Sequence, residues 1–423
     1  MIWRCLHLVI VTFYLIAPPA AIVIDGFRSR RRKRSVPGAW LVGVVLVGVM
    51  LGTSMSVIYA FVVDGKVRIG QTMLASYFAV GLLLMLRMFD RFLQFILGYV
   101  LRVNRFVGKP SIAFRSRLGL AGLARMVILF GVGMPYVMAS IMTYRPKVEL
   151  NGDPQTQLAY PFESVEFNAT DGTKLSGWWI PAERPRGRRQ IASGQNTVLI
   201  CHGLASNKSN QLVLARGFVP YGYNVLIFDF RAHGASGGQL TSFGDLERQD
   251  VLGAIRWIRE NHNKQAQHIY GVGASMGAAA LIAAAGDPSP EGQAIDAIAA
   301  YGSYDSVRAE TFSFADDRFV TPLRWLLERF GLPLASAQVG SDLSEFSPAV
   351  LVRDLWPRPI LVIHGMNDEV VSFPRGEALF QSAEQPKSRL WIDHAGNNDI
   401  LRDNGVAERV REFFQSAQPV PVI

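Results

Sequence analysis

Cysteine and charged residues are both scarce in this chain of 423 residues. It contains only two cysteines, Cys5 and Cys201, which excludes a disulfide scaffold. The chain has no Cys-x-x-Cys pair, so a zinc site built from thiolates is excluded as well. Charged residues make up 18% and apolar residues 49% of the chain, whereas soluble globular proteins carry about 25% charge. The composition excludes extensive disorder and predicts that part of the chain lies in lipid.

The excess of positive charge is confined to the first third of the chain. Residues 1–150 hold 19 Lys and Arg against 4 Asp and Glu, a net charge of +15. Residues 151–423 hold 24 against 30, a net charge of −6. A folded domain that gripped nucleic-acid phosphates would show the opposite distribution. We therefore expect no nucleic-acid partner.

Four stretches near the N-terminus are apolar enough to cross a bilayer, which takes about 20 residues. They are Cys5–Ile24, Ala39–Val63, a run from Gln71 to Leu86, and Leu120–Met142. A helix buried in a soluble protein would need only shorter apolar runs. We predict an all-α transmembrane region of about four helices over residues 1–145 and a linker over 146–160, with the lipid bilayer as a partner.

Basic residues are concentrated in two of the three loops that separate these stretches. Residues 28–34 hold six Lys and Arg and residues 102–117 hold five, whereas residues 64–70 hold two. Because basic loops stay in the cytoplasm, we expect an integral membrane protein, of a bacterial inner membrane, whose C-terminal domain is extracytoplasmic. Two alternatives stay open. The first stretch could be a signal peptide cleaved near residues 19–21, and a re-entrant span would reverse the side of the catalytic domain.

From residue 161 onward, short apolar runs alternate with helical patterns. This alternation predicts a mostly parallel sheet with helices on both faces over residues 161–423. Asp171-Gly172 between the first two runs is a strong hairpin signal. Active sites in such sheets lie at the carboxyl ends of the strands. The predicted strands are Ser164–Asn168, Lys174–Ile180, Thr197–Cys201, Asn224–Phe228, His268–Val272, Ala297–Tyr301, Ile360–Ile363 and Arg389–Ile392.

A Gly-x-Ser-x-Gly pattern, Gly273-Ala274-Ser275-Met276-Gly277, follows one of these strands and precedes a small-residue helix. This is the setting of a nucleophile elbow, where flanking glycines leave room for a strained turn that presents the Ser hydroxyl. The N–H of Met276 would then face a developing oxyanion. A glycine-rich phosphate-binding turn is the alternative, but neither Gly-x-Gly-x-x-Gly nor Gly-Lys-Ser/Thr is present.

Two other strand ends carry candidate residues. Leu204, in His202-Gly203-Leu204 after the first parallel strand, is placed to supply a second oxyanion donor from its backbone N–H. We read His202 itself as a hydrogen-bonded structural residue. Asp368 follows a late strand, where a carboxylate can orient an imidazole. A loop Asp that caps a turn is the alternative for Asp368, and Glu369 is its local competitor.

Taken together, these motifs resemble the α/β-hydrolase superfamily, with triad order Ser, Asp, His. The closest resemblance is to the membrane-anchored group of alpha/beta-hydrolase-domain or serine-aminopeptidase-like proteins. It implies an α/β-hydrolase fold and serine hydrolase chemistry without cofactor or metal, on an ester, thioester or peptide within a small-molecule or acylated substrate. The residues that carry the resemblance are Asp171-Gly172, His202-Gly203, Asp229-Phe230-Arg231-Ala232-His233-Gly234-Ala235-Ser236, the Ser275 elbow and His364-Gly365-Met366-Asn367-Asp368.

The chain departs from that group at the general base. The group commonly ends its last strand with Ala-Gly-His-Asn-Asp, whereas this chain has Asn397 at the His position and His394 three residues earlier. An asparagine cannot accept the Ser proton at neutral pH. His394 alone among the seven histidines lies on the loop after the last strand, so we predict it as the base. The alternative is a catalytically inactive hydrolase-fold membrane scaffold or binding protein.

Residues 303–346, between two core strands, are longer than a crossover requires. They are rich in aromatic and large apolar side chains, which suits a lid over a site for acyl or aromatic substrates. A helix packed on the sheet is an equal alternative. The side chains concerned are Phe312, Phe314, Phe319, Trp325, Leu326 and Phe330.

Overall fold

The structure, a computed structural model, covers the C-terminal part of the chain in detail. It describes residues 134–144, 147–183, 194–318, 324–325, 327–396 and 404–417. The first three predicted spans, most of the fourth, and Asn397 lie outside these residues. Within the described part, no helix is both long and apolar enough to cross a membrane.

The chain divides into two compact units, Met1–Met134 and Pro135–Ile423. The sequence places the end of the helical region at residue 145, so the last residues of that region belong to the second unit. Helix α5 (Met134–Thr143) begins at this boundary. The predicted linker is partly structured, because it contains the short helix α6 (Pro154–Leu158), capped by Asp153.

The second unit contains an eight-stranded sheet in the order β1-β2-β4-β3-β5-β6-β7-β8 within its described residues. Strand β2 is antiparallel to β1 and β4, and every other pairing is parallel. This confirms the predicted mostly parallel sheet. The strands are β1 (Glu163–Asn168), β2 (Lys174–Ile180), β3 (Asn196–Cys201), β4 (Tyr223–Asp229), β5 (His268–Ala274), β6 (Ile295–Tyr301), β7 (Ile360–Gly365) and β8 (Lys387–Ile392).

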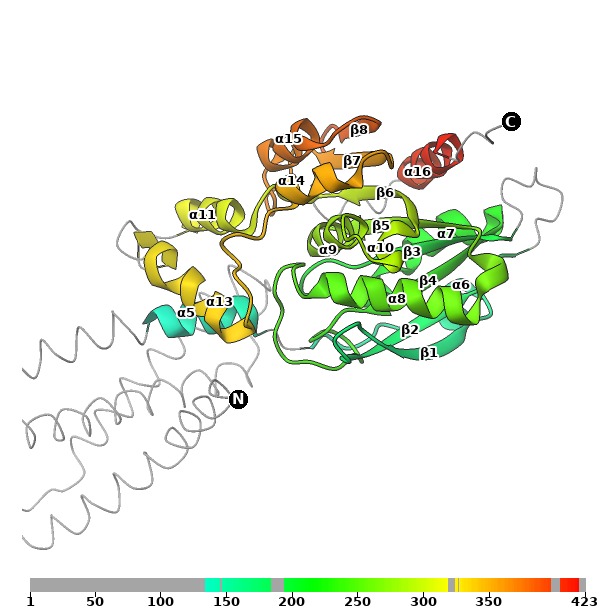
Figure 1. Ribbon diagram of the computed structural model, residues 1–423, viewed down its shortest axis with the longest axis horizontal. Coiled ribbons are helices and arrows are strands. Elements are labelled where there is room, and N and C mark those ends of the chain that lie inside the picture. The colour runs from blue at the N-terminus through cyan, green and yellow to red at the C-terminus, as the bar shows by residue number, and fades with distance from the viewer. Residues whose placement is uncertain are drawn as a thin grey trace, which may run out of the picture. The chain divides into compact units, whose positions relative to one another are not determined.

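Helices cover both faces of the sheet, because the central strands are apolar on both sides. In β3, Leu199 and Cys201 join the core under one set of helices, and Val198 and Ile200 join the core under the other. The first set is α8 (Glu247–Asn261), α9 (Met276–Ala285) and α15 (Phe373–Ser382). The second is α7 (Leu212–Phe218) and α16 (Asn404–Ser416). Figure 1 shows α8 lying across one face of the sheet.

The described part of residues 303–346 forms a helical cap that packs on α9 and α5. It comprises α11 (Val307–Arg318), the π-helix η6 (Leu327–Gly331) and α13 (Leu332–Val339). Its apolar side chains form one buried cluster with Ala279 and Ala283 of α9 and Ala139 of α5. Of the predicted aromatic residues, Phe312 is half-buried, whereas Trp325 and Phe330 are exposed. Phe319, Leu326 and the side chain of Phe314 lie outside the description.

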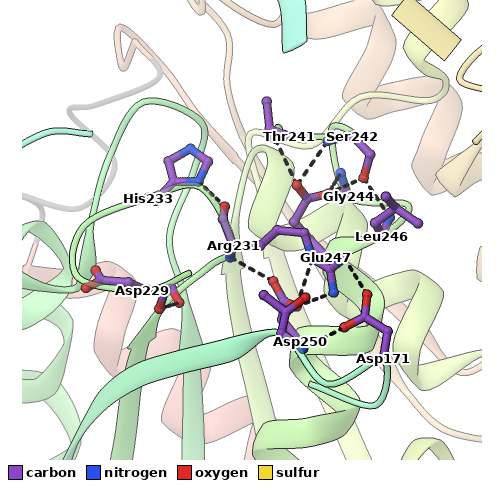
Figure 2. Close-up of polar contacts among 12 residues, drawn as sticks. Asp171, Asp229, Arg231, His233, Thr241, Ser242, Gly244, Leu246, Glu247 and Asp250 are labelled. Atoms are coloured by element: carbon purple, nitrogen blue, oxygen red, sulfur yellow. Dashed lines mark hydrogen bonds and ion pairs between the residues drawn. The ribbon is translucent and has the colours of Figure 1, made fainter. Parts of the chain in front are cut away.

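A buried guanidinium links three segments at the carboxyl end of β4 (Figure 2). Arg231 donates from Nε and Nη2 to Oδ1 of Asp250 at 2.9 and 2.6 Å, and its backbone N–H donates to Oδ2 at 2.8 Å. Its Nη1 reaches Oδ2 of Asp171 at 2.7 Å. Arg231 therefore joins the β1–β2 turn, the end of β4 and the first turns of α8.

Glu247, one turn earlier on α8, organises the preceding loop. Its carboxylate accepts hydrogen bonds from the hydroxyl of Thr241, from the N–H and hydroxyl of Ser242, and from the N–H of Gly244. The hydroxyl of Thr241 also lies 3.3 Å from the sulfur of Met276. This loop consequently packs against the start of α9, directly behind the predicted nucleophile.

The electrostatics of the Arg231 cluster depend on burial. Burial raises the pKa of Asp250 to about 7 despite the adjacent guanidinium, and the carboxylate of Glu247 adds to the rise. Burial alone would lower the pKa of Arg231, but the carboxylates of Asp250 and Asp171 raise it. The cation is therefore retained, and it is what makes a charged Asp250 tolerable inside the fold.

Replacing Arg231 with Met should destabilise the fold in a pH-dependent way. The change leaves a buried carboxyl without its cation, which costs about 3–5 kcal/mol of unfolding free energy when that carboxyl is charged. An acid whose folded-state pKa is raised stabilises the fold when protonated, and that stability is lost as the pH rises from its unfolded pKa through its folded pKa. The loss of unfolding free energy in Arg231→Met, relative to the wild type, should therefore be largest near pH 8 and smaller near pH 5. Urea denaturation of the full chain in detergent measures it.

Arg248→Met is the matched control. Its guanidinium is 40% exposed and lies 3.8 Å from Asp245, so its removal should change the unfolding free energy by no more than about 0.5 kcal/mol. Equal stability of the two variants at both pH values would contradict the role assigned to Arg231.

Candidate active site

Ser275 occupies a strained turn between β5 and α9. Its φ of 47° and ψ of −115° lie where side-chain-bearing residues are rarely found. The flanking glycines have no room for a side chain. A Cβ on Gly273 would lie 2.6 Å from Cα of Ala278, and one on Gly277 would lie 2.4 Å from the carbonyl oxygen of His202. This is the geometry of a nucleophile elbow.

The backbone on either side of Ser275 is fixed by hydrogen bonds. Its N–H donates to the carbonyl of Tyr301 on β6 at 2.9 Å, and its carbonyl accepts from the N–H groups of Ala278 and Ala279 in α9. The side chain is half-buried. Among the described residues, its hydroxyl has no hydrogen-bond partner, so its oxygen is not committed to a structural role there.

The loop that follows β3 lies directly against this elbow. A Cβ on Gly203 would be 3.4 Å from Cβ of Ser275, which is ordinary van der Waals contact. Within the described part of the chain, the N–H of Leu204 and the N–H of Met276 have no hydrogen-bond partner. Two uncommitted donors therefore belong to the segments that adjoin Ser275, and an oxyanion hole needs donors from such segments.

Two buried histidines hold that loop in place. Nε2 of His202 accepts from the N–H of Phe230 at 3.0 Å, and Nδ1 donates to the carbonyl of Gly203 at 2.8 Å. Nε2 of His233 accepts from the N–H of Ala205 at 3.4 Å. Burial, together with His233, lowers the pKa of His202 to about 3. The ring of His202 is therefore neutral at physiological pH and serves a structural purpose.

A buried ion pair that sequence reasoning missed fastens the far end of the same loop. Nζ of Lys208 lies 3.0 Å from Oδ2 of Asp229, and both side chains are almost completely buried. The ammonium also donates to the hydroxyl of Ser176 and lies 5.0 Å from the ring centroid of Trp178. Asp229 accepts in addition from the N–H of Lys208 at 2.7 Å. A lysine in a polar loop is normally exposed, so its sequence position carried no signal of this role.

Asp368 lies after β7, where the sequence places it, and is buried. Its Oδ1 accepts from the N–H groups of Val370 and Val371 at 2.8 and 2.9 Å. Its Oδ2 lies 3.7 Å from Nε2 of His364, a ring that is engaged with the carbonyl of Val371. Glu369, its sequence competitor, is exposed. The structure therefore offers the carboxylate of Asp368, rather than that of Glu369, as the buried acid at this strand end.

The loop after β8 runs alongside the loop that carries Asp368. The N–H of Asn367 donates to the carbonyl of Ala395 at 3.2 Å, and the N–H of Met366 donates to that of Ile392 at 3.0 Å. His394 is exposed on this loop with φ of 60°. Among the described residues, its ring hydrogen-bonds neither Ser275 nor Asp368. The structure thus brings the loop of His394 alongside the loop of Asp368.

The remaining histidines of the described part have other surroundings. The ring of His262 stacks on Trp179, with centroids 3.9 Å apart, and Nδ1 of His268 lies 3.4 Å from Asp296. In this part of the chain, no imidazole hydrogen-bonds Ser275. No group of His, Cys, Asp and Glu there is arranged to hold a metal ion.

A cavity of about 290 Å³ lies beside the cap rather than at Ser275. Its lining combines the loop before α8 with the segment that leads out of the cap. The lining residues are Asp245, Arg248, Ser341, Asp342, Glu345, Phe346, Ser347, Val350 and Leu351.

Comparison with known proteins places this geometry in a family. The family model for "Serine aminopeptidase, S33" matches residues 192–329, which include the β3 loop and the elbow. The uncharacterized protein YqkD of Bacillus subtilis is 31% identical over 302 residues, covering 66% of this chain and 90% of YqkD. The uncharacterized protein YfhR of Escherichia coli is 27% identical over 295 residues, covering 69% of this chain and 92% of YfhR.

Solved structures agree with the sequence relatives. The esterase Pf2001 of Pyrococcus furiosus is 25% identical, with a TM-score of 0.51, and the match covers 64% of this chain and 98% of the esterase. Three findings agree: the family model matches across the elbow, YqkD is covered over most of its length, and the esterase shares the sheet architecture. The chain belongs to the α/β-hydrolase superfamily.

Proposed function

We propose that this protein is a membrane-anchored serine hydrolase that cleaves an ester, thioester or amide through an acyl-enzyme. The observation that carries the proposal is the strained Ser275, whose hydroxyl is uncommitted among the described residues and whose turn adjoins the loop after β3. The packing around Ser275 holds it in this conformation, and strain of this kind clusters at catalytic sites. The likeness to an esterase from Pyrococcus furiosus supports the same reaction class.

In the proposed reaction, Ser275 Oγ attacks the substrate carbonyl and passes its proton to a base. The carbonyl oxygen gains negative charge, which the N–H groups of Leu204 and Met276 stabilise. Collapse of this intermediate expels the alcohol, thiol or amine, which receives the proton from the base. Water then attacks the acyl-enzyme in the same manner and releases the carboxylic acid and free Ser275.

We assign the base to His394 and the orienting acid to Asp368. The loops that carry them are joined by backbone hydrogen bonds, and Asp368 is buried with one oxygen held by two N–H groups. The ring of His394 is exposed, and in the proposed reaction it accepts the proton of Ser275 once substrate is bound. Catalytic hydrogen bonds often tighten only when the substrate is bound.

A second function has a specific observation in its favour. The group that this chain resembles usually has a His where this chain has Asn397, and the nearby His394 is exposed without a hydrogen bond to Ser275 or Asp368 among the described residues. An α/β-hydrolase domain without a base would be a membrane scaffold or binding protein. The two functions differ in whether Ser275 is nucleophilic.

The membrane part of the proposal rests on the apolar stretches that precede residue 143 and on the distribution of basic residues. We propose that these stretches anchor the protein in a bacterial inner membrane, with the hydrolase domain on the extracytoplasmic side. Both named relatives come from bacteria.

A fluorophosphonate probe should label the wild-type protein in isolated membranes, because such probes react with an activated serine. Ser275→Ala should abolish the labelling. The matched control is Ser388→Ala, which removes an exposed hydroxyl on β8 and should leave the labelling unchanged. Labelling that persists in Ser275→Ala would exclude this nucleophile, and a wild type that is not labelled would favour the binding protein.

His394→Ala should lower kcat/KM toward a soluble ester by about 10²–10⁴-fold, the usual contribution of general acid–base catalysis. Asn397→Ala should have a small effect, because an amide cannot move the proton. Steady-state kinetics of both variants separate the two positions. Full activity in His394→Ala would remove this residue from the mechanism.

The same probe tests the side of the membrane. A membrane-impermeant fluorophosphonate should label Ser275 in cells whose outer barrier is opened but whose inner membrane is intact. Labelling that appears only after the inner membrane is permeabilised would place the domain in the cytoplasm and contradict the orientation drawn from the basic loops.

A further inference from the structure

Helix α5 is fastened to the cap by a fixed set of contacts. Ala139 is completely buried, in a cluster with α9 and the cap helix α13. The side-chain amide of Gln338 on α13 spans two residues of α5: its Nε2 donates to Oγ of Ser140 at 3.0 Å, and its Oε1 accepts from Oγ1 of Thr143 at 2.8 Å. Figure 1 shows α5 and α13 lying side by side.

The cap thus meets the chain at residues that belong to the fourth apolar stretch, Leu120–Met142. The chain therefore enters the described domain through α5, the helix to which the cap is fastened. If the stretch is a membrane span, as the proposed function requires, the cap is joined directly to the part of the chain that leaves that span.

The cap carries an exposed pair of aromatic side chains. Trp325 is 56% exposed and Phe330 is 37% exposed, with ring centroids 5.6 Å apart in an edge-to-face arrangement. Two arginines flank them, Arg324 and Arg329, and both are exposed. Arg324 is paired with Glu328 at 3.2 Å, so Arg329 supplies the positive charge in excess among these described residues.

This composition is that of a membrane-interface segment. Tryptophan collects at the boundary between headgroups and acyl chains, and arginine is attracted to anionic headgroups. If the segment stayed in water, these two large aromatic rings would expose apolar surface. Burial of that surface is favourable.

We propose that the aromatic pair Trp325 and Phe330 docks into the headgroup region of the bilayer that holds the preceding spans. The docking positions the cap, and through α13 the α9 side of the hydrolase domain, against the lipid surface. This inference rests on the membrane anchoring in the proposed function and is independent of whether Ser275 is catalytic.

Quenching of tryptophan fluorescence by brominated lipid tests the proposal. The full chain is reconstituted into vesicles of equal parts phosphatidylcholine and phosphatidylglycerol, with and without bromine on the acyl chains. The component of fluorescence lost to bromine should fall in Trp325→Phe relative to the wild type. It should stay at the wild-type level in Trp356→Phe, which removes a 67% exposed tryptophan just before the amino end of β7, whereas the cap follows the carboxyl end of β6.

An equal bromine-dependent loss in the wild type and in Trp325→Phe would overturn the docking. Alkaline carbonate extraction of wild-type membranes keeps the two proposals distinguishable. Release of the chain by carbonate would overturn the membrane anchor and the docking with it. Retention of the chain without Trp325 quenching would overturn only the docking. Quenching in a chain that the fluorophosphonate fails to label would support the docking while removing the hydrolase activity.

Discussion

The fold depends on one constraint: Ser275 is held in a backbone conformation that costs about 1–3 kcal/mol. The strain persists because neither neighbour can relax. Strand β5 is paired on both sides, by β3 and β6, and every residue of α9 is buried. The close packing at Gly277 also brings the first turn of α9 against the end of β3. The loop after β3, with its uncommitted N–H at Leu204, is consequently delivered next to the serine hydroxyl.

Buried charges stabilise the loops around that serine from the far end of β4. Asp229 holds the loop after β3 through Lys208, and Arg231, two residues later, holds the β1–β2 turn and α8 through Asp171 and Asp250. All three pairs connect segments that are distant in sequence. Such pairs contribute specificity of arrangement more than net stability, which suits an edge of the sheet where several loops must keep fixed positions.

The sequence was sufficient for the sheet but not for the polar interior. All eight strands are recognisable because buried strands read as short apolar runs. The observed β2 matches its run, and the other seven strands extend theirs by one or two residues. Lys208 and Glu247 could not be identified, because their partners come from elsewhere in the fold. The position of the His394 ring depends on a positive φ in a loop, which no periodicity encodes.

The two hydrogen bonds made by Gln338 limit how α13 can move relative to α5. An amide that bridges two residues of α5 fixes the register of the two helices, so α13 cannot slide along α5 without losing both bonds. Within the described part of the cap, η6 departs from α-helical winding, so a change in the shape of the cap that keeps both bonds would fall on η6 rather than on α13.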